Sequence, residues 1–222
     1  MKKIITLVLA ATFGLSASAQ KIKVKQSTEN IGGGSHNALS VTLTGISPSD
    51  AEDAFRSFMK KYDGKRSSKE GSIFIDHAII KEMGNNTIDV YGKAQGKKDD
   101  PEINFIVAFD LGGAFLNSGE HKDQYQVAEK IVKEFAVKAT KDAIEAKLRA
   151  ATKIQEKFED EQKSLVKDNK NLTEDIDDHK KKIKKAEDDV VKNKADQDKK
   201  KAEIEAQKKV VGEIDKALKA VE

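Results

Sequence analysis

The chain has 222 residues, of which 36% are charged and 37% are hydrophobic, with no Cys or Trp and only 2 Pro. A charged fraction so far above the ~25% of ordinary globular domains cannot all lie on the surface of one compact body. We therefore expect part of the molecule to be elongated. The lack of Cys excludes disulfides, thiolate metal sites, thiol nucleophiles and an acylated lipoprotein Cys.

The first residues have the three parts of a secretory signal peptide. A basic start at 1–3 precedes a mostly apolar run at 4–15, and Ala17-Ser18-Ala19 is a small-x-small cleavage site. The run is shorter than the ~20 residues that span a bilayer, and no later run approaches that length. We expect a signal peptide over 1–19, cleavage after Ala19, no integral membrane segment thereafter, and a periplasmic or extracellular protein.

Removal of this segment also changes the charge argument. Cleavage removes two of the 41 basic residues and none of the 38 acidic ones, so the mature chain has a net charge of +1. A near-neutral chain gives no electrostatic reason to expect a nucleic-acid partner.

Glycine and proline divide the chain into two halves. Residues 20–119 contain 12 of the 14 Gly and both Pro, whereas residues 120–222 contain one Gly and no Pro. Since these residues punctuate turns and strands, the first half is predicted to be a turn-rich domain and the second to be helical. We place an extended segment with a Gly-rich joint at 20–36, a head domain including the start of a long helix at 37–140, and a coiled-coil region at 141–222.

Within the head, residues 39–43 alternate between apolar and polar side chains, which is typical of a half-buried strand. Ser47-Pro48 then begins a helix with one apolar stripe from Ala51 to Tyr62, and Gly64 ends it. Strand-forming runs follow at 72–80, 87–95 and 103–111. Ser118 is the expected cap of the next helix, whose first apolar stripe includes Tyr125, Val132 and Phe135. Residues 21–25 alternate too and are expected to add an edge strand, followed by a flexible joint at 32–35.

This order of strand, helix, three or four antiparallel strands and helix predicts an α+β fold: a small antiparallel-sheet head with helices on one face, followed by a long coiled-coil helix or helical hairpin. The element order resembles the TBP-like and helix-grip layouts. That resemblance implies a fold only, because fold alone does not give function.

From Ile144 onward, seam residues recur at alternating steps of 4 and 3, the spacing of a coiled coil. Such a helix needs a partner, because helices in proteins gain most of their stability by packing an apolar face. Either the helix is continuous and associates with another copy, or it turns at 168–171 and packs on itself; the unbroken spacing favours continuity. The seam residues predicted to make the interaction are Leu148, Phe158, Leu165, Leu172, Ile176, Ile183, Val190, Ile204, Val211, Ile214 and Leu218.

No catalytic constellation is found in the sequence. The four His are scattered and make no H-x-H or H-E-x-x-H pair. Gly33-Gly34-Ser35-His36 lacks the flanking residues of a phosphate loop or nucleophile elbow, and Asp99, Asp100 and Glu102 lack the spacing of an EF-hand. We therefore predict no catalytic residue, no cofactor and no metal site.

These observations favour a non-enzymatic exported envelope protein, which binds a protein partner or assembles by self-association through the coiled coil. Two alternatives remain open. One is a periplasmic holdase, since a signal peptide with long charged helical arms resembles the Skp-type chaperones. The other is a small-ligand site in the head.

Overall fold

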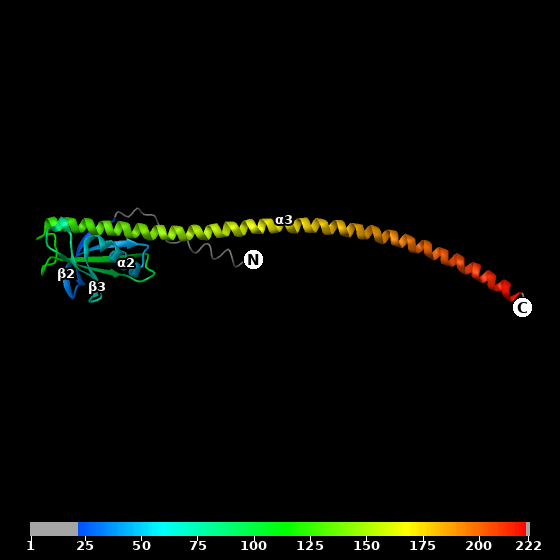
Figure 1. Cartoon of the computed structure of the whole chain (residues 1–222), viewed down its shortest axis with the longest axis horizontal. Coiled ribbons are helices and arrows are strands. Elements are labelled where there is room, and N and C mark those ends of the chain that lie inside the picture. The colour runs from blue at the N-terminus through cyan, green and yellow to red at the C-terminus, as the bar shows by residue number, and fades with distance from the viewer. Residues whose placement is uncertain (1–21, 221–222) are drawn as a thin grey trace. The chain divides into compact units, whose positions relative to one another are not determined.

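The computed structural model of the chain describes residues 22–220, so the predicted signal peptide and its cleavage after Ala19 lie outside the described residues. The chain divides into two compact units, the first ending at Thr152 and the second beginning at Lys153. The first unit contains a six-stranded sheet, and the helix α3 begins there and continues through the second unit (Figure 1).

All strand pairs of the sheet are antiparallel, in the order β1-β2-β6-β5-β4-β3. The strands are β1 (Val24–Ile31), β2 (Gly34–Thr44), β3 (Asp63–Lys69), β4 (Ser72–Ala78), β5 (Ile88–Gln95) and β6 (Glu102–Asp110). The helices are α2 (Pro48–Phe58), the 3-10 turns η2 (Met59–Tyr62) and η3 (Lys81–Met83), and α3 (Lys122–Lys219). The predicted α+β class, with a sheet head and a long helix, is confirmed.

Helix α2 begins where its sequence predicts but ends at Phe58; the rest of the predicted stripe lies in η2, and Gly64, the expected stop, belongs to β3. Ser47 caps α2, its hydroxyl oxygen accepting a hydrogen bond from the Asp50 amide at 3.2 Å, and Pro48 occupies the first turn. The side chains of Ala51, Phe55 and Met59 are fully buried against the sheet, so the apolar stripe is the face that joins the core.

The segment expected to be a flexible joint is instead a tight hairpin turn. Gly32 and Gly33 have φ of +67° and +87°, which the two-residue type I′ turn requires and which glycine adopts without strain. Ile31 pairs with Gly34, and the ladder continues to Val24 opposite Val41. The glycines that suggested flexibility therefore join β1 to β2, and the edge strand starts later than the expected 21–25.

Two other local predictions need correction. Strand β3 was not singled out, because Asp63–Lys69 is polar and has no apolar alternation; its pairing with β4 makes it an edge strand. Ser118 does not cap α3. The Asn117 side-chain oxygen accepts from the amides of Gly119 and Glu120 at 3.0 and 2.9 Å, while the Ser118 amide donates to Gln26 at 2.9 Å.

Three phenyl rings from different elements form the centre of the core. Phe55 of α2, Phe105 of β6 and Phe135 of α3 are 0–1% exposed, and their ring centroids lie 4.8–5.1 Å apart. Both helices therefore cover the same face of the sheet, and the start of α3 belongs to the first unit.

A smaller apolar cluster lies on the opposite face of the sheet. Ile106 and Ala108 alternate with the core residues of β6 and are fully buried there with Tyr91. Phe115, from the loop before α3, packs on this cluster, and its ring stacks on His36 at 3.7 Å. His36 thus serves as a packing residue.

Replacing Phe135 tests whether α3 is part of the head core. Phe135→Ala should destabilise the first unit by ~3–5 kcal/mol, because it removes a ring that contacts both other rings. Val137→Ala, whose side chain is 48% exposed on the same helix, is the control and should cost less than ~0.5 kcal/mol. Urea unfolding followed by tyrosine fluorescence reports on this unit, since Tyr62, Tyr91 and Tyr125 all lie in it. Equal unfolding midpoints for the two variants would contradict the packing.

Candidate functional site

Helix α3 changes its environment along its length. Ala128, Ile131, Val132, Phe135, Ala136 and Ala139 are buried in the head core. Burial ends shortly afterwards, and every residue from 146 to 220 is exposed. One helix therefore has a face that the head covers and, further on, a long stretch that nothing in the described chain covers.

The helix is continuous where the alternative hairpin would turn. Residues 168–173 are helical, and the Thr173 hydroxyl donates to the Asn169 carbonyl at 2.8 Å, one helical turn back. With no Gly or Pro at this point, local chemistry does not end the helix. The continuous helix is thus present, and the hairpin is absent from the described residues.

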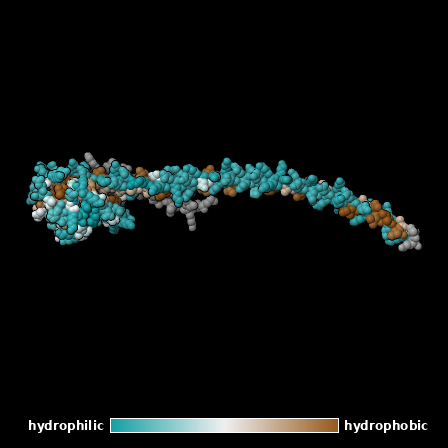
Figure 2. Space-filling view, viewed as in Figure 1, coloured by the Kyte–Doolittle hydropathy of each residue, from teal (hydrophilic) through white to brown (hydrophobic). Residues whose placement is uncertain are grey.

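The eleven predicted seam residues are all exposed. The exposed fraction of these residues runs from 47% at Phe158 to 68% at Leu165. Their 4-and-3 spacing aligns them along one side of the helix. Figure 2 shows apolar surface recurring along an otherwise hydrophilic helix. This row of unburied Leu, Ile, Val and Phe is the most prominent candidate for an interaction surface.

Polar side chains interrupt the seam at Asn193, Gln197 and Lys200. Gln197 donates to the Asn193 side-chain oxygen at 2.5 Å, and Lys200 pairs with Glu203 at 2.5 Å. These groups satisfy one another along the helix surface, so the gap in the apolar row is not a hole left by unpaired charge.

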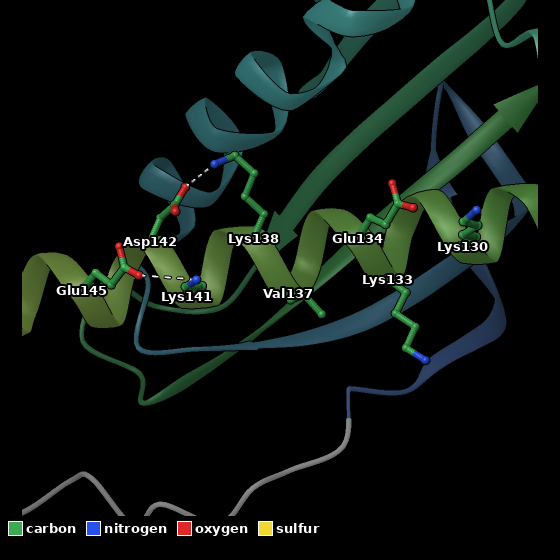
Figure 3. A pocket seen from close by; sticks show the side chains of 8 residues that line it. All are labelled: Lys130, Lys133, Glu134, Val137, Lys138, Lys141, Asp142 and Glu145. Atoms are coloured by element: carbon green, nitrogen blue, oxygen red, sulfur yellow. Dashed lines mark hydrogen bonds and ion pairs between the residues drawn. The ribbon is translucent and has the colours of Figure 1, made fainter.

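An open groove lies along the earlier part of α3, between residues 130 and 145 (Figure 3). Most of its charges are paired, Lys138 with Asp142 at 2.9 Å and Lys141 with Glu145 at 3.7 Å, whereas Lys130 and Lys133 make no ion pair within the described residues. Glu134 pairs with Lys61 of η2 at 3.3 Å. Such paired charges do not converge on a point where a ligand would sit, and we interpret this groove as a solvated helix face.

Two tyrosines near this helix have perturbed hydroxyl groups. Burial raises the pKa of Tyr62, partly offset by its hydrogen bond to Lys61, and burial with the nearby Glu129 raises the pKa of Tyr125. A raised pKa keeps the phenol neutral, so neither group is activated as a base or nucleophile.

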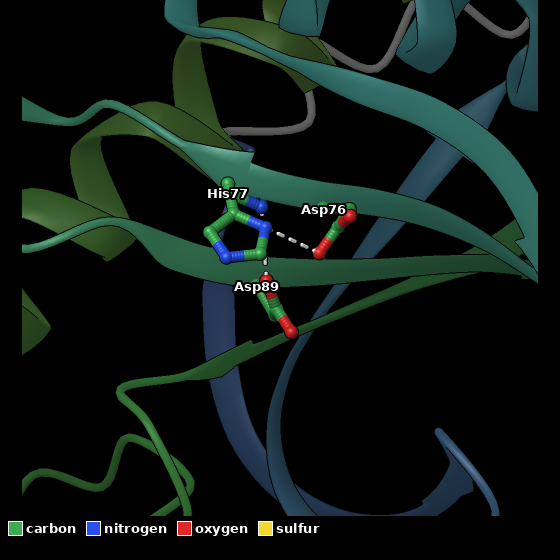
Figure 4. A group of neighbouring side chains, drawn as sticks. All are labelled: Asp76, His77 and Asp89. Carbon is green, nitrogen blue, oxygen red and sulfur yellow. Dashed lines mark hydrogen bonds and ion pairs between the residues drawn. The ribbon is translucent and has the colours of Figure 1, made fainter.

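Asp76, His77 and Asp89 form a cluster that sequence reasoning missed (Figure 4). The Asp76 carboxylate lies 2.6 Å from His77 Nδ1, and Asp89 accepts a hydrogen bond from the His77 amide at 3.0 Å. His77 has φ of +57° at an irregularity in the pairing of β4 with β5. Asp89 therefore stabilises a bulged backbone, and this role accounts for its place in the cluster.

No sequence pattern could have revealed that cluster, because Asp76 and Asp89 meet only through the β4–β5 pairing. The acidic residues Asp99, Asp100 and Glu102, which lack EF-hand spacing, lie at or beside the turn between β5 and β6. The carboxylate of Asp100 accepts from the Lys97 amide at 2.6 Å and closes the turn between β5 and β6.

The chain matches no protein-family model, no curated protein sequence and no solved structure. Among the described residues, no helix is both long and apolar enough to cross a membrane.

The polar stretch of the seam provides a test of burial. If it faces another helix, changing Asn193→Leu, Gln197→Ile and Lys200→Leu together should stabilise the helical region by at least ~1 kcal/mol, because buried polar groups cost free energy. Thermal unfolding followed by circular dichroism measures the shift. Lys192→Leu with Lys199→Leu, on the outer face, is the control and should leave the melting temperature nearly unchanged. No shift in the seam variant would mean that this stretch faces solvent.

Proposed function

We propose that this chain is an exported, non-enzymatic envelope protein that displays its α+β head on a coiled-coil stalk and works by partner binding or assembly. The exposed seam of α3 is the observation that leads to this proposal. Burying a Leu, Ile, Val or Phe side chain contributes about 1.5–3 kcal/mol, and the eleven seam residues are at least 47% exposed. A protein surface with that much recoverable free energy in one row is suited to association with another helix.

Export is supported by the basic start, apolar run and cleavage site at 1–19. The periplasm or the extracellular space is then the proposed location. The lack of Cys fits such a location, because no thiol is exposed to oxidation there.

The proposal that the head is not an enzyme is supported by how its interior is filled. The rings of Phe55, Phe105 and Phe135 meet between sheet and helices, where a ligand pocket in a fold of this kind would otherwise form. The same observation weakens the small-ligand alternative. In the one mixed histidine and carboxylate cluster found in the described chain, Asp89 accepts from the His77 backbone amide and Asp76 contacts the exposed His77 ring.

The holdase alternative keeps one supporting observation. Apolar side chains spaced along a charged helix, such as Leu165, Ile183 and Leu218, are also able to contact unfolded chains. The two functions differ in whether the seam is buried. A stalk buries its seam permanently in an assembly, whereas a holdase arm must leave its seam exposed for clients.

Seam substitutions test the assembly proposal. Ile176→Ser, Ile183→Ser and Val190→Ser together should convert the assembled protein in an envelope extract to a single chain, measured by size-exclusion chromatography with light scattering. Val191→Ser, Ala195→Ser and Ala202→Ser, on the outer face, introduce the same number of Ser residues into the helix and should leave the assembly intact. Wild-type protein that elutes as a single chain and suppresses aggregation of a heat-denatured client would favour the holdase instead.

The export proposal has its own test. Protein recovered from the envelope or medium should begin at Gln20, because cleavage follows the small-x-small site ending at Ala19. Intact-mass measurement identifies the N-terminus directly. Exported material that retains residues 1–19 would contradict this route.

A further inference from the structure

Charged residues flank the seam of the second unit in an ordered pattern. Seam positions alternate between type a, reached by a step of 4 (such as Ile176 and Val190), and type d, reached by a step of 3 (such as Asn193). The position before each a is called g, and the position after each d is called e. From residue 175 to 208, four of the five g residues are acidic and four of the five e residues are basic.

We propose that the seam of α3 is occupied by a second copy of this chain, parallel and in register. This inference rests on the proposed assembly function and specifies its partner. In a parallel, in-register pair, each g residue faces the partner's e residue five positions later in sequence. All five such pairs in this stretch join opposite charges. They are Asp175 with Lys180, Lys182 with Glu187, Asp189 with Lys194, Asp196 with Lys201, and Glu203 with Lys208.

The departures from the simple acid-at-g, base-at-e rule support the register. At one heptad the signs are exchanged, with Lys182 at g and Glu187 at e, and the exchange occurs in both members of the same pair. A stagger of one heptad would face Lys182 with Lys194 and Asp175 with Glu187, which are like charges. Charge complementarity in this stretch is therefore complete only in register.

An antiparallel pair is disfavoured by the same residues. In that orientation g faces g and e faces e. Since Asp189, Asp196 and Glu203 are at g, and Lys194 and Lys201 at e, most antiparallel alignments bring acid to acid and base to base. Like charges across an interface repel each other, so they destabilise the antiparallel pair.

These flanking charges are mostly unengaged on their own helix. Of the ten, only Lys180, Glu203 and Lys208 make an ion pair within the described chain, at 3.4, 2.5 and 2.9 Å. The remaining seven project from an exposed helix and are available to a facing chain.

The surface of the helix also has a hollow where a partner side chain would enter. It is lined by Asp189, Val190, Asn193, Lys194 and Gln197. Val190 (a), Asn193 (d), Lys194 (e) and Gln197 (the next a) are the four positions that surround an inserted d side chain of a parallel partner helix. In the parallel, in-register pair, the inserted side chain is Asn193 of the second copy, whose amide can hydrogen-bond to Asn193 of the first.

Most side chains at a are compatible with a two-stranded pair. Of the six a residues from 176 to 211, five are β-branched, as is common in parallel dimers, and the sixth is Gln197. Earlier in the same seam, Asn169 lies at a, where in-register pairing places it against its own counterpart and helps to specify register.

Single-cysteine variants of the mature full-length chain determine the orientation, because the chain has no Cys of its own. Ile176→Cys, Val190→Cys and Val211→Cys should each give a disulfide-linked dimer under mild oxidation, at least ten-fold faster than Ala195→Cys on the outer face. An antiparallel pair could cross-link at no more than one of these positions, the one on its two-fold axis. Cross-linking at one seam position alone would overturn the inference.

Charge reversal tests the flanking pairs separately. Lys194→Glu, Lys201→Glu and Lys208→Glu make one variant; Asp189→Lys, Asp196→Lys and Glu203→Lys make the other. Each alone should dimerise at least ten-fold more weakly than wild type by analytical ultracentrifugation, and an equimolar mixture should restore a heterodimer. Unchanged dimers of both variants would overturn the role of these charges.

The outcomes also separate this inference from the proposed function. If the purified chain is a monomer while a seam-dependent assembly persists in the extract, the partner is another protein and only this inference fails. If neither the dimer nor a seam-dependent assembly is found, the assembly function fails with it.

Discussion

A single helix with two apolar faces sets the organisation of this protein. The first face, from Ala128 to Ala139, is buried against the sheet with the phenyl rings of the core. The second, beyond residue 146, is exposed along its whole length. Because helices in proteins gain most of their stability by packing an apolar face, the second face is the one for which we propose a partner.

The head is organised around its own burial instead of around a cavity. Phe55, Phe105 and Phe135 occupy the space between sheet and helices, and Phe115 with His36 packs on the other side of the sheet. The positive φ at His77 is the kind of backbone feature that accompanies function in many proteins, but here the Asp89 carboxylate satisfies the bulged backbone. The head therefore has a filled interior, and in the proposed role it acts by binding a partner through its surface.

The seam and its flanking charges have different physical tasks. Burial of Ile176, Ile183 and Val190 would supply the free energy of association, since an exposed ion pair contributes only ~0–1 kcal/mol. The proposed ion pairs would instead distinguish orientations, because a one-heptad stagger and most antiparallel alignments bring like charges into contact. A seam weakened by Asn193, Gln197 and Lys200 makes this distinction more important, since apolar packing alone specifies register poorly.

Periodicity along the chain made much of this visible in the sequence. The capped stripe of α2, strands β2, β4, β5 and β6, and the exposed seam of α3 all follow from local spacing of apolar residues, which depends only on helix and strand geometry. Features that depend on pairing between distant segments were missed or misjudged. Strand β3 has no periodicity of its own, Gly32 and Gly33 become a turn only because β1 pairs with β2, and Asp76 meets Asp89 only through the sheet register.

The sequence by itself determined that α3 would have a seam and which residues would form it, because the 4-and-3 spacing is a property of one helix. The change from the first apolar stripe to the seam, near residue 140, is also a property of the sequence. Only the tertiary structure decided that Ala128 to Ala139 are buried, because they pack on a sheet whose long-range strand pairing no local pattern encodes.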